Sequence, residues 1–152
     1  PDVATHQVLS DASYECACGW SPDFQFMWRL SCEDLLLLSF PLKLVTSADR
    51  EPEMDAAGKH INHLEFIAAI ITLWLLLKCI QHLSPCRTGY IVDLWSDNTS
   101  ALSWMKVTAA TRNPDLQPLA RFASALLVQT SRLLTRVQPV HIPVKEMWRQ
   151  TH

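Results

Sequence analysis

The distribution of hydrophobic and polar residues in the N-terminal part of the chain predicts three short strands. Residues 5–11, 14–20 and 24–30 have the length and composition of strands and are separated only by short turn-forming segments. Strands joined by such short connections pair in antiparallel fashion. We therefore expect a meander with Asp11 at or just past the end of its first strand, where the carboxylate either forms an Asx turn or belongs to a site.

The longest hydrophobic stretch, residues 61–82, predicts a helix. Residues 66–77 are apolar on nearly all sides, so the helix is expected to be heavily buried. A membrane span needs about 20 apolar residues, and this apolar run is shorter because Glu65 and Lys78 bound it. No membrane partner is expected. The face packed against the sheet is predicted to consist of Phe66, Ile70, Trp74 and Leu77.

The start of this helix has the form of a capping box. In the run Asn62-His63-Leu64-Glu65, Asn62 would cap the helix and Glu65 would reach back to it. This interpretation places Glu65 in the first helical turn, near the edge of the sheet.

Residues 90–105 combine a buried strand with a turn into a helix. The strand at 90–95 is rich in β-branched and aromatic residues, and 96–100 supplies several possible helix caps. Asp97 either caps this helix through the amide of Ser100 or lies at the carboxyl edge of the sheet, where open α/β sheets bind ligands. Asp93 shares a strand face with Asp97. If buried it needs a partner, and the candidates are Arg87, Lys106 and Arg112.

The remaining elements complete an α/β pattern. Residues 116–134 predict a helix, and residues 138–144 predict a final strand that Pro139 and Pro143 restrict to a sheet edge. Residues 31–59, with an apolar run at 35–38 and a charged stretch after it, predict a long loop or insertion. The chain of 152 residues is expected to form one domain. Its start at Pro1 suggests a fragment of a larger polyprotein.

Composition narrows the classes of function. A hydrophobic fraction of 49% with 18% charged residues is that of a globular domain. The net charge of -2 argues against a large phosphate-binding surface but allows a local basic patch. The five cysteines include no CxxC pair, so reduced thiols and an intracellular location are expected. Cys16 and Cys18 would be small core residues. A weaker metal hypothesis combines Cys79, His82 and Cys86 with His60 and His63.

Four short motifs occur in order along nearly the whole chain: SDAS at residues 10–13, INHLE at 61–65, WSDNTSA at 95–101 and VHIP at 140–143. Together they resemble the ribonuclease H domain of retroelement reverse transcriptases, most closely that of DIRS-type retrotransposons. The resemblance implies a ribonuclease H-like fold, with a five-stranded mixed sheet in the order 3-2-1-4-5 flanked by helices. It also implies cleavage of the RNA strand of an RNA–DNA hybrid.

By the same resemblance, Asp11, Glu65 and Asp97 would be the catalytic and metal-binding acids. Two Mg²⁺ or Mn²⁺ ions are the expected cofactors, with no small-molecule cofactor, because hard cations prefer oxygen ligands. The expected partners are the hybrid and a neighbouring reverse transcriptase domain of the same polyprotein. Residues expected to contact the substrate are Ser13, Asn98, Thr99 and His141.

The chain departs from the family after its final strand. The family has a Gly, an Asn and then an Ala-Asp that supplies a fourth carboxylate, whereas this chain has Val144 for the Gly and Thr151 for the Asp. Glu146 is a nearby acid at the wrong spacing. We therefore expect the last helix to be missing or degenerate and metal binding to be weakened.

Three functions remain open from the sequence. The first is an active, metal-dependent hybrid nuclease. The second is a catalytically impaired ribonuclease H-like domain that acts as a nucleic-acid-binding or structural module. The third is a helical interaction domain in which Glu65 and Asp97 are only caps. The first requires Asp11 and Asp97 to converge with Glu65 at one sheet edge, and stabilisation by Mg²⁺ or Mn²⁺ would separate the first two functions from the third.

Overall fold

The computed structural model describes residues 5–37, 59–83, 91–106, 116–132 and 136–143. The strands are β1 (Thr5–Ala12), β2 (Cys16–Ser21), β3 (Phe26–Ser31), β4 (Ile91–Ser96) and β5 (Arg136–His141). The helices are α1 (Cys32–Leu37), α3 (Lys59–Leu83), α4 (Thr99–Met105) and α5 (Gln117–Arg132).

The five strands form one open mixed sheet in the order β3-β2-β1-β4-β5. The meander β1-β2-β3 is antiparallel, whereas β4 is parallel to β1 and β5 is parallel to β4. The predicted sheet order and mixed pairing are confirmed. β5, which contains Pro139, lies at the edge as expected, because a proline cannot donate a hydrogen bond to a neighbouring strand.

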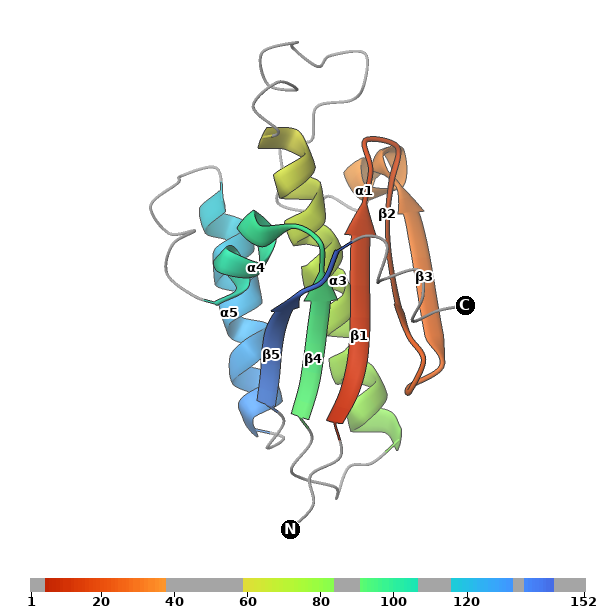
Figure 1. The fold of residues 1–152 in the computed structure, drawn as a ribbon, viewed down its shortest axis with the longest axis vertical. Helices are drawn as coiled ribbons and strands as arrows, with labels where there is room; N and C mark the ends of the chain where they lie inside the picture. Colours follow the sequence, from red (N-terminus) through yellow and green to blue (C-terminus); the bar gives the residue numbers. More distant parts are fainter. Residues whose placement is uncertain (1–4, 38–58, 84–90, 107–115, 133–135, 144–152) are drawn as a thin grey trace.

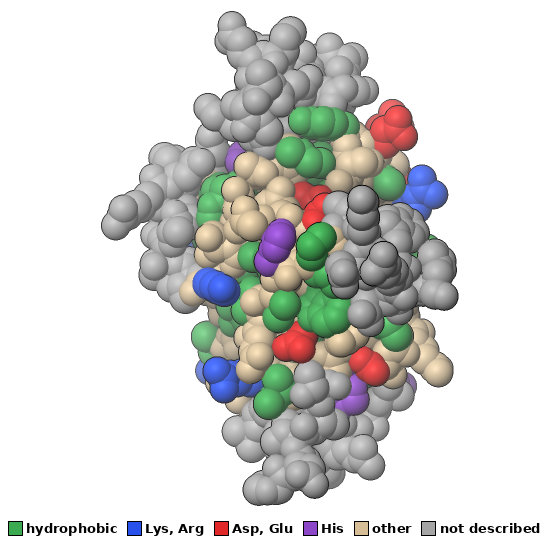
Figure 2. All heavy atoms as spheres, in the orientation of Figure 1, with side chains coloured by type: hydrophobic (Ala, Val, Ile, Leu, Met, Phe, Trp, Pro, Cys, Tyr) green, Lys and Arg blue, Asp and Glu red, His purple; other side chains and the backbone are tan. Residues whose placement is uncertain are grey.

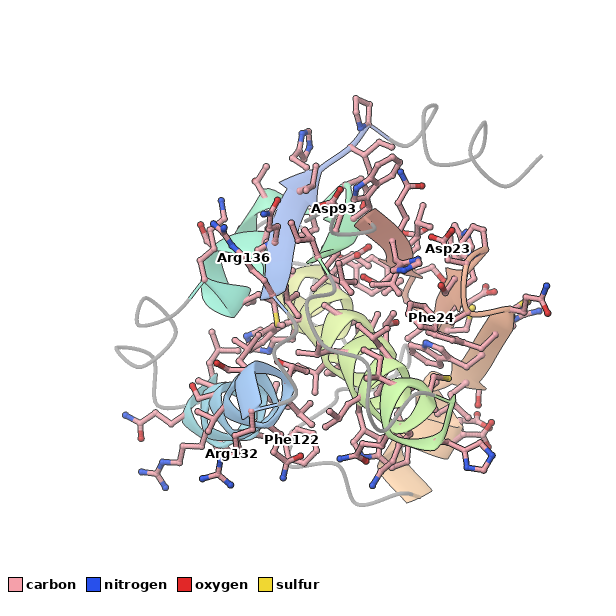
Figure 3. All side chains as sticks on the ribbon, turned by 90° about the horizontal axis from the view of Figure 1, so that it is seen from below. Asp23, Phe24, Asp93, Phe122, Arg132 and Arg136 are labelled. Carbon is pink, nitrogen blue, oxygen red and sulfur yellow. The ribbon has the colours of Figure 1, made fainter. Side chains whose placement is uncertain are left out.

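The long helices cover one face of this sheet. Figure 1 looks onto the strands with α3 behind them, and Figure 3 shows α3 and α5 on the same side of the sheet. α3 packs across β1 and β2 and also contacts α4 and α5. The main core lies between these layers. Its largest fully buried side chains include Phe66, Ile67, Ile70, Leu73, Leu76, Leu77 and Leu94.

A smaller hydrophobic cluster lies on the other face of the sheet. Leu9 and Ile142 are buried there, with the partly buried Trp20 and Trp95 packed against them. Leu9 pairs with Trp20 on one side and with Trp95 on the other. Leu9 and Trp95 lie two residues before Asp11 and Asp97 in the sequence, so apolar side chains adjoin the polar end of these two strands.

The apolar character of α3 is explained by its position in the core. The helix has 25 residues, and by length and composition alone it could cross a membrane. Such a helix is also typical of a protein core, and most of this one is buried against the sheet and its neighbouring helices. The expectation of a heavily buried helix is confirmed.

Gly19 on β2 allows α3 to approach the sheet closely. A Cβ atom at this position would overlap Thr72 Oγ1 and Trp28 Nε1. These two atoms are themselves hydrogen bonded at 2.9 Å, and Thr72 also donates to the carbonyl of Ala68. The hydrogen bond that joins α3 to β3 therefore lies directly over Gly19.

Several expectations from the sequence are corrected by the structure. Trp74, predicted to face the sheet, is 41% exposed, and Lys78 Nζ lies 5.9 Å from its ring centroid. Its three predicted companions on the core face are buried. Cys16 and Cys18 share a face as expected but are only half-buried, because Ala17 and Gly19 occupy the side covered by α3.

The segment 31–59, predicted to be a loop or insertion, begins with the short helix α1. The charged stretch that follows, residues 38–58, lies outside the described residues, as do residues 144–152 and the expectation of a missing or degenerate last helix.

The burial of α3 predicts unequal costs for two truncations. Replacing fully buried Ile70 with Ala should cost about 3 kcal/mol of unfolding free energy, because it removes core contacts and leaves a cavity. Trp74→Ala should cost about 1 kcal/mol, since much of the ring is in solvent. Urea denaturation measures both values. An equal or larger loss for Trp74→Ala would contradict this orientation of α3.

The close contact at Gly19 predicts that Gly19→Ala is strongly destabilising. The loss should be about 3 kcal/mol, because the methyl group forces Thr72 and Trp28 apart and breaks their hydrogen bond. Met27→Ala, at a residue that is 75% exposed on the neighbouring strand, is the matched control and should change stability little. Equal stability of the Gly19→Ala and wild-type proteins in urea would show that α3 lies farther from β2.

Candidate metal centre

Three carboxylates from separate elements meet at the carboxyl ends of the central strands. Asp11 is near the end of β1, Asp97 follows β4, and Glu65 projects from α3. β1 and β4 are parallel with Leu9 opposite Trp95, so the two aspartates, two residues farther on, lie side by side. One oxygen from each carboxylate lies within 4.8 Å of those of the other two. The predicted convergence is confirmed.

Glu65 reaches the cluster in a different way from the one predicted. α3 begins at Lys59, so Glu65 lies in the second turn and the capping box with Asn62 is wrong. Its Oε1 instead accepts a 3.0 Å hydrogen bond from the backbone N–H of Ala12. This bond joins α3 to β1 directly after Asp11. The other oxygen, Oε2, is buried and has no donor among the described residues.

Asp97 does not cap α4. The N-cap is Asn98, whose Oδ1 accepts a 2.8 Å hydrogen bond from the N–H of Ala101. The alternative in which Glu65 and Asp97 serve only as helix caps is therefore wrong for both residues. Asp97 remains just past the end of β4 with its carboxylate beside Asp11 and Glu65.

Burial and the charges of neighbouring acids disfavour the charged forms of Glu65 and Asp97. Burial raises the pKa of Glu65 to about 9, and the charges of Asp11 and Asp97 and a side-chain hydrogen bond with Asp11 act in the same direction. The N–H of Ala12 opposes this rise only in part. With a pKa of about 9, Glu65 holds a proton at neutral pH when no cation is bound.

The pKa of Asp97 is also raised. Burial is the main cause and the charge of Asp11 adds to it, while the backbone of Asp97 and the nearby His141 act in the opposite direction. The expectation that one of the two aspartates titrates above its ordinary value is confirmed. Burial contributes more than the like-charge repulsion on which the expectation was based.

Cys18 is a neighbour of the cluster that the sequence did not indicate. It lies opposite Asp11 in the β1–β2 pairing. Burial, followed by the charges of Asp11, Cys16 and Glu65, raises the pKa of its thiol to about 11, although Arg29 on β3 lowers it. The thiol is therefore neutral and a poor nucleophile. Only the register of the hairpin, with Asp11 opposite Cys18, could have signalled this neighbour.

The residues expected to contact a substrate lie at the border of the cluster or near it. His141 ends β5 and is close enough to affect Asp97. Asn98 caps α4, and Thr99 is the exposed first residue of that helix. Ser13 belongs to the β1–β2 turn, where its Oγ accepts hydrogen bonds from the N–H groups of Glu15 and Cys16.

The other charged candidates do not form a second site in the described part of the chain. Asp93 lies within β4, before the end of the strand that leads to Asp97, and forms no ion pair with any described residue, Lys106 included. Arg87 and Arg112 lie outside the described residues, as does Cys86 of the alternative metal hypothesis. In Figure 2, the Lys and Arg side chains that are coloured lie toward the margins of the displayed face.

The composition of the cluster suits a hard divalent cation. Three carboxylates supply oxygen ligands of the kind that Mg²⁺ and Mn²⁺ prefer, and Glu65 Oε2 is a buried acceptor without a donor. A cation would neutralise the repulsion and complete the coordination of that oxygen. Among the described residues this is the one group of three or more acidic, histidine or cysteine side chains placed to hold a metal ion.

The chain was compared with protein-family models, curated proteins and solved structures, and it matches none of them. The features of the chain that indicate a function are therefore the geometry of the acidic cluster and the motifs that contain its residues.

The raised pKa of Glu65 predicts how stability changes with pH. Between the ordinary value of 4.5 and about 9, the folded protein binds one proton more than the unfolded chain. The unfolding free energy of the metal-free protein should therefore fall as pH rises through this window, by about 1 kcal/mol per pH unit. Urea denaturation in the presence of a chelator, repeated across this pH range, measures the slope.

The variant Glu65→Gln should remove most of this slope, whereas Glu33→Gln, at an exposed position on α1, should keep it. Adding Mn²⁺ should stabilise the wild-type protein increasingly as pH rises, because metal ligands must be deprotonated. A flat profile for the wild-type protein would show that Glu65 is ionised without penalty.

Proposed function

We propose that this chain is a divalent-metal-dependent nuclease of the ribonuclease H type, which cleaves the RNA strand of RNA–DNA hybrids within a retroelement reverse transcriptase polyprotein. The observation that carries this proposal is the convergence of Asp11, Glu65 and Asp97 from β1, α3 and the end of β4. The strand order β3-β2-β1-β4-β5 and the mixed pairing are consistent with a ribonuclease H-like fold.

The three carboxylates fit the requirements of phosphodiester hydrolysis. Bound to them, two divalent ions would activate a water molecule and stabilise the leaving oxygen of the cleaved strand. The protein would contribute by placing the carboxylate oxygens that bind the ions. Asp11 and Asp97 present oxygens from neighbouring parallel strands, and Glu65 closes the group from the helix above them while Ala12 fixes its orientation.

A nucleic-acid substrate would bring phosphate charge close to the acidic cluster, and bound cations would offset the repulsion. The chain carries a net charge of -2, and on the face shown in Figure 2 the coloured Lys and Arg side chains lie toward the margins. Phosphate groups near the cluster would therefore be neutralised mainly by bound metal. Contacts from Asn98, Thr99 and His141, which border the cluster, would be hydrogen bonds to the substrate.

The second candidate is a ribonuclease H-like domain that binds hybrids but does not cleave them. It is favoured by one observation, the presence of Thr151 where the family that the motifs resemble has its fourth carboxylate. Three carboxylates with one buried, protonated member would bind divalent ions less tightly than four. Cleavage and binding assays on the same protein separate the two candidates.

The proposal predicts that hybrid cleavage depends on the acidic cluster. The full chain should cleave the RNA strand of a labelled RNA–DNA hybrid in Mg²⁺ or Mn²⁺ and should be inactive with a chelator. Asp97→Asn and Glu65→Gln should each reduce the rate by about 100-fold or more, since even the loss of an outer-shell partner of a metal costs 10–100-fold.

The matched control is Asp93→Asn, which removes a carboxylate from the same strand outside the cluster. It should cleave at the wild-type rate. Binding of the hybrid without cleavage in either metal would support the second candidate. Cleavage that persists in Asp97→Asn or without divalent ions would overturn the proposed function.

A further inference from the structure

Two asparagines connect the elements that carry Glu65 and Asp97. Asn62 lies one helical turn before Glu65 on α3, and Asn98 directly follows Asp97. The Nδ2 group of Asn98 donates a 2.8 Å hydrogen bond to Oδ1 of Asn62. The two side chains therefore join α3 to the turn between β4 and α4 right beside the acidic cluster.

The hydrogen bonds of Asn98 define the orientation of this contact. Its Oδ1 accepts from the N–H of Ala101, and its own N–H donates to Ser96 Oγ at 3.1 Å. A backbone N–H can only donate, so the side-chain oxygen of Asn98 must face Ala101 and its Nδ2 must face Asn62. Asn62 in turn must present its oxygen. A single arrangement of the two amides satisfies all of these contacts.

We propose that the hydrogen bond between Asn62 and Asn98 is a positioning clamp that holds Glu65 within metal-ligand distance of Asp97. This inference rests on the proposed metal-dependent function. The clamp is needed because three carboxylates whose oxygens lie within 4.8 Å repel one another when ionised. A neutral amide pair adds attraction between the same two elements without adding charge to the cluster.

α3 and α4 also make an aromatic contact, and its effect on metal binding must be distinguished from that of the clamp. The Trp104 ring on α4 lies 5.5 Å from the ring of Phe66 and 5.8 Å from that of His63, centroid to centroid. This packing joins the two helices through residues next to Asn62 and Glu65 on α3 and through a residue near the C-terminal end of α4. It contributes to stability and is not expected to control the position of the Asp97 carboxylate relative to Glu65.

The test removes the clamp from each side and measures metal affinity. Asn62→Ala deletes the acceptor, while Asn98→Ser deletes the donor and keeps a side-chain oxygen able to cap α4. Titration calorimetry with Mn²⁺ on the full chain should show a Kd about 10-fold higher for each variant, as is typical of outer-shell partners. The double variant should show no greater loss than either single variant, because both remove the same bond.

Two controls distinguish positioning from general stability. Trp104→Leu should lower the unfolding free energy of the metal-free protein but leave the Mn²⁺ Kd near that of the wild type. Gln81→Ala, at an exposed position far along α3, should change neither quantity. A Trp104→Leu effect on Kd as large as that of Asn62→Ala would show that any loosening of α4 weakens the site, which would overturn the clamp.

The wild-type protein separates this inference from the proposed function. If it binds Mn²⁺ and cleaves hybrids, unchanged Kd values in Asn62→Ala and Asn98→Ser overturn the clamp alone. If it binds Mn²⁺ without cleaving hybrids, the nuclease proposal fails while the Kd comparison still decides the clamp. A wild-type chain that binds no Mn²⁺ overturns both. Losses in the two single variants that add in the double variant would also contradict a shared bond.

Discussion

The packing of α3 across β1 and β2 is the interaction on which the rest of the structure depends. Gly19 leaves room for the helix, and the hydrogen bond between Trp28 and Thr72 joins the helix to β3, the last strand of the meander. The same packing places Glu65 at the end of β1, where the N–H of Ala12 donates a hydrogen bond to its carboxylate. The packing of the core and the geometry of the acidic cluster therefore both depend on how closely α3 approaches the sheet.

That arrangement holds the carboxylates together at an electrostatic cost. Glu65 is 3% exposed, and burial together with two neighbouring acids raises its pKa far above the ordinary value. A group of this kind destabilises the folded protein when it ionises, and a bound cation relieves that cost. Apolar residues at these positions would make a purely structural core more stable, so the three acids are consistent with a site that could hold a cation.

Neither Glu65 nor Asp97 is needed to cap a helix. Asn98 takes the role that Asp97 could have taken, and the early start of α3 at Lys59 releases Glu65 from a capping box. Neither acid therefore caps a helix, and their carboxylates lie close together at the edge of the sheet. Asn62 and Asn98, whose residue types alone suggested caps or substrate contacts, form a bond between two distant parts of the chain.

The sequence by itself determined the elements other than α1 and the edge position of β5, because hydrophobic periodicity and proline chemistry are local properties. The resemblance of its motifs indicated the three acids. The sequence did not determine which side of α3 faces the sheet. Residues 66–77 are apolar all round, so nothing local distinguished Trp74, which is exposed, from Ile70, which is buried. The tertiary structure alone also decided the caps, the approach of Cys18 to Asp11, and the clamp between Asn62 and Asn98. Each depends on strand register or on the packing of segments far apart in sequence, and these are set by the fold as a whole.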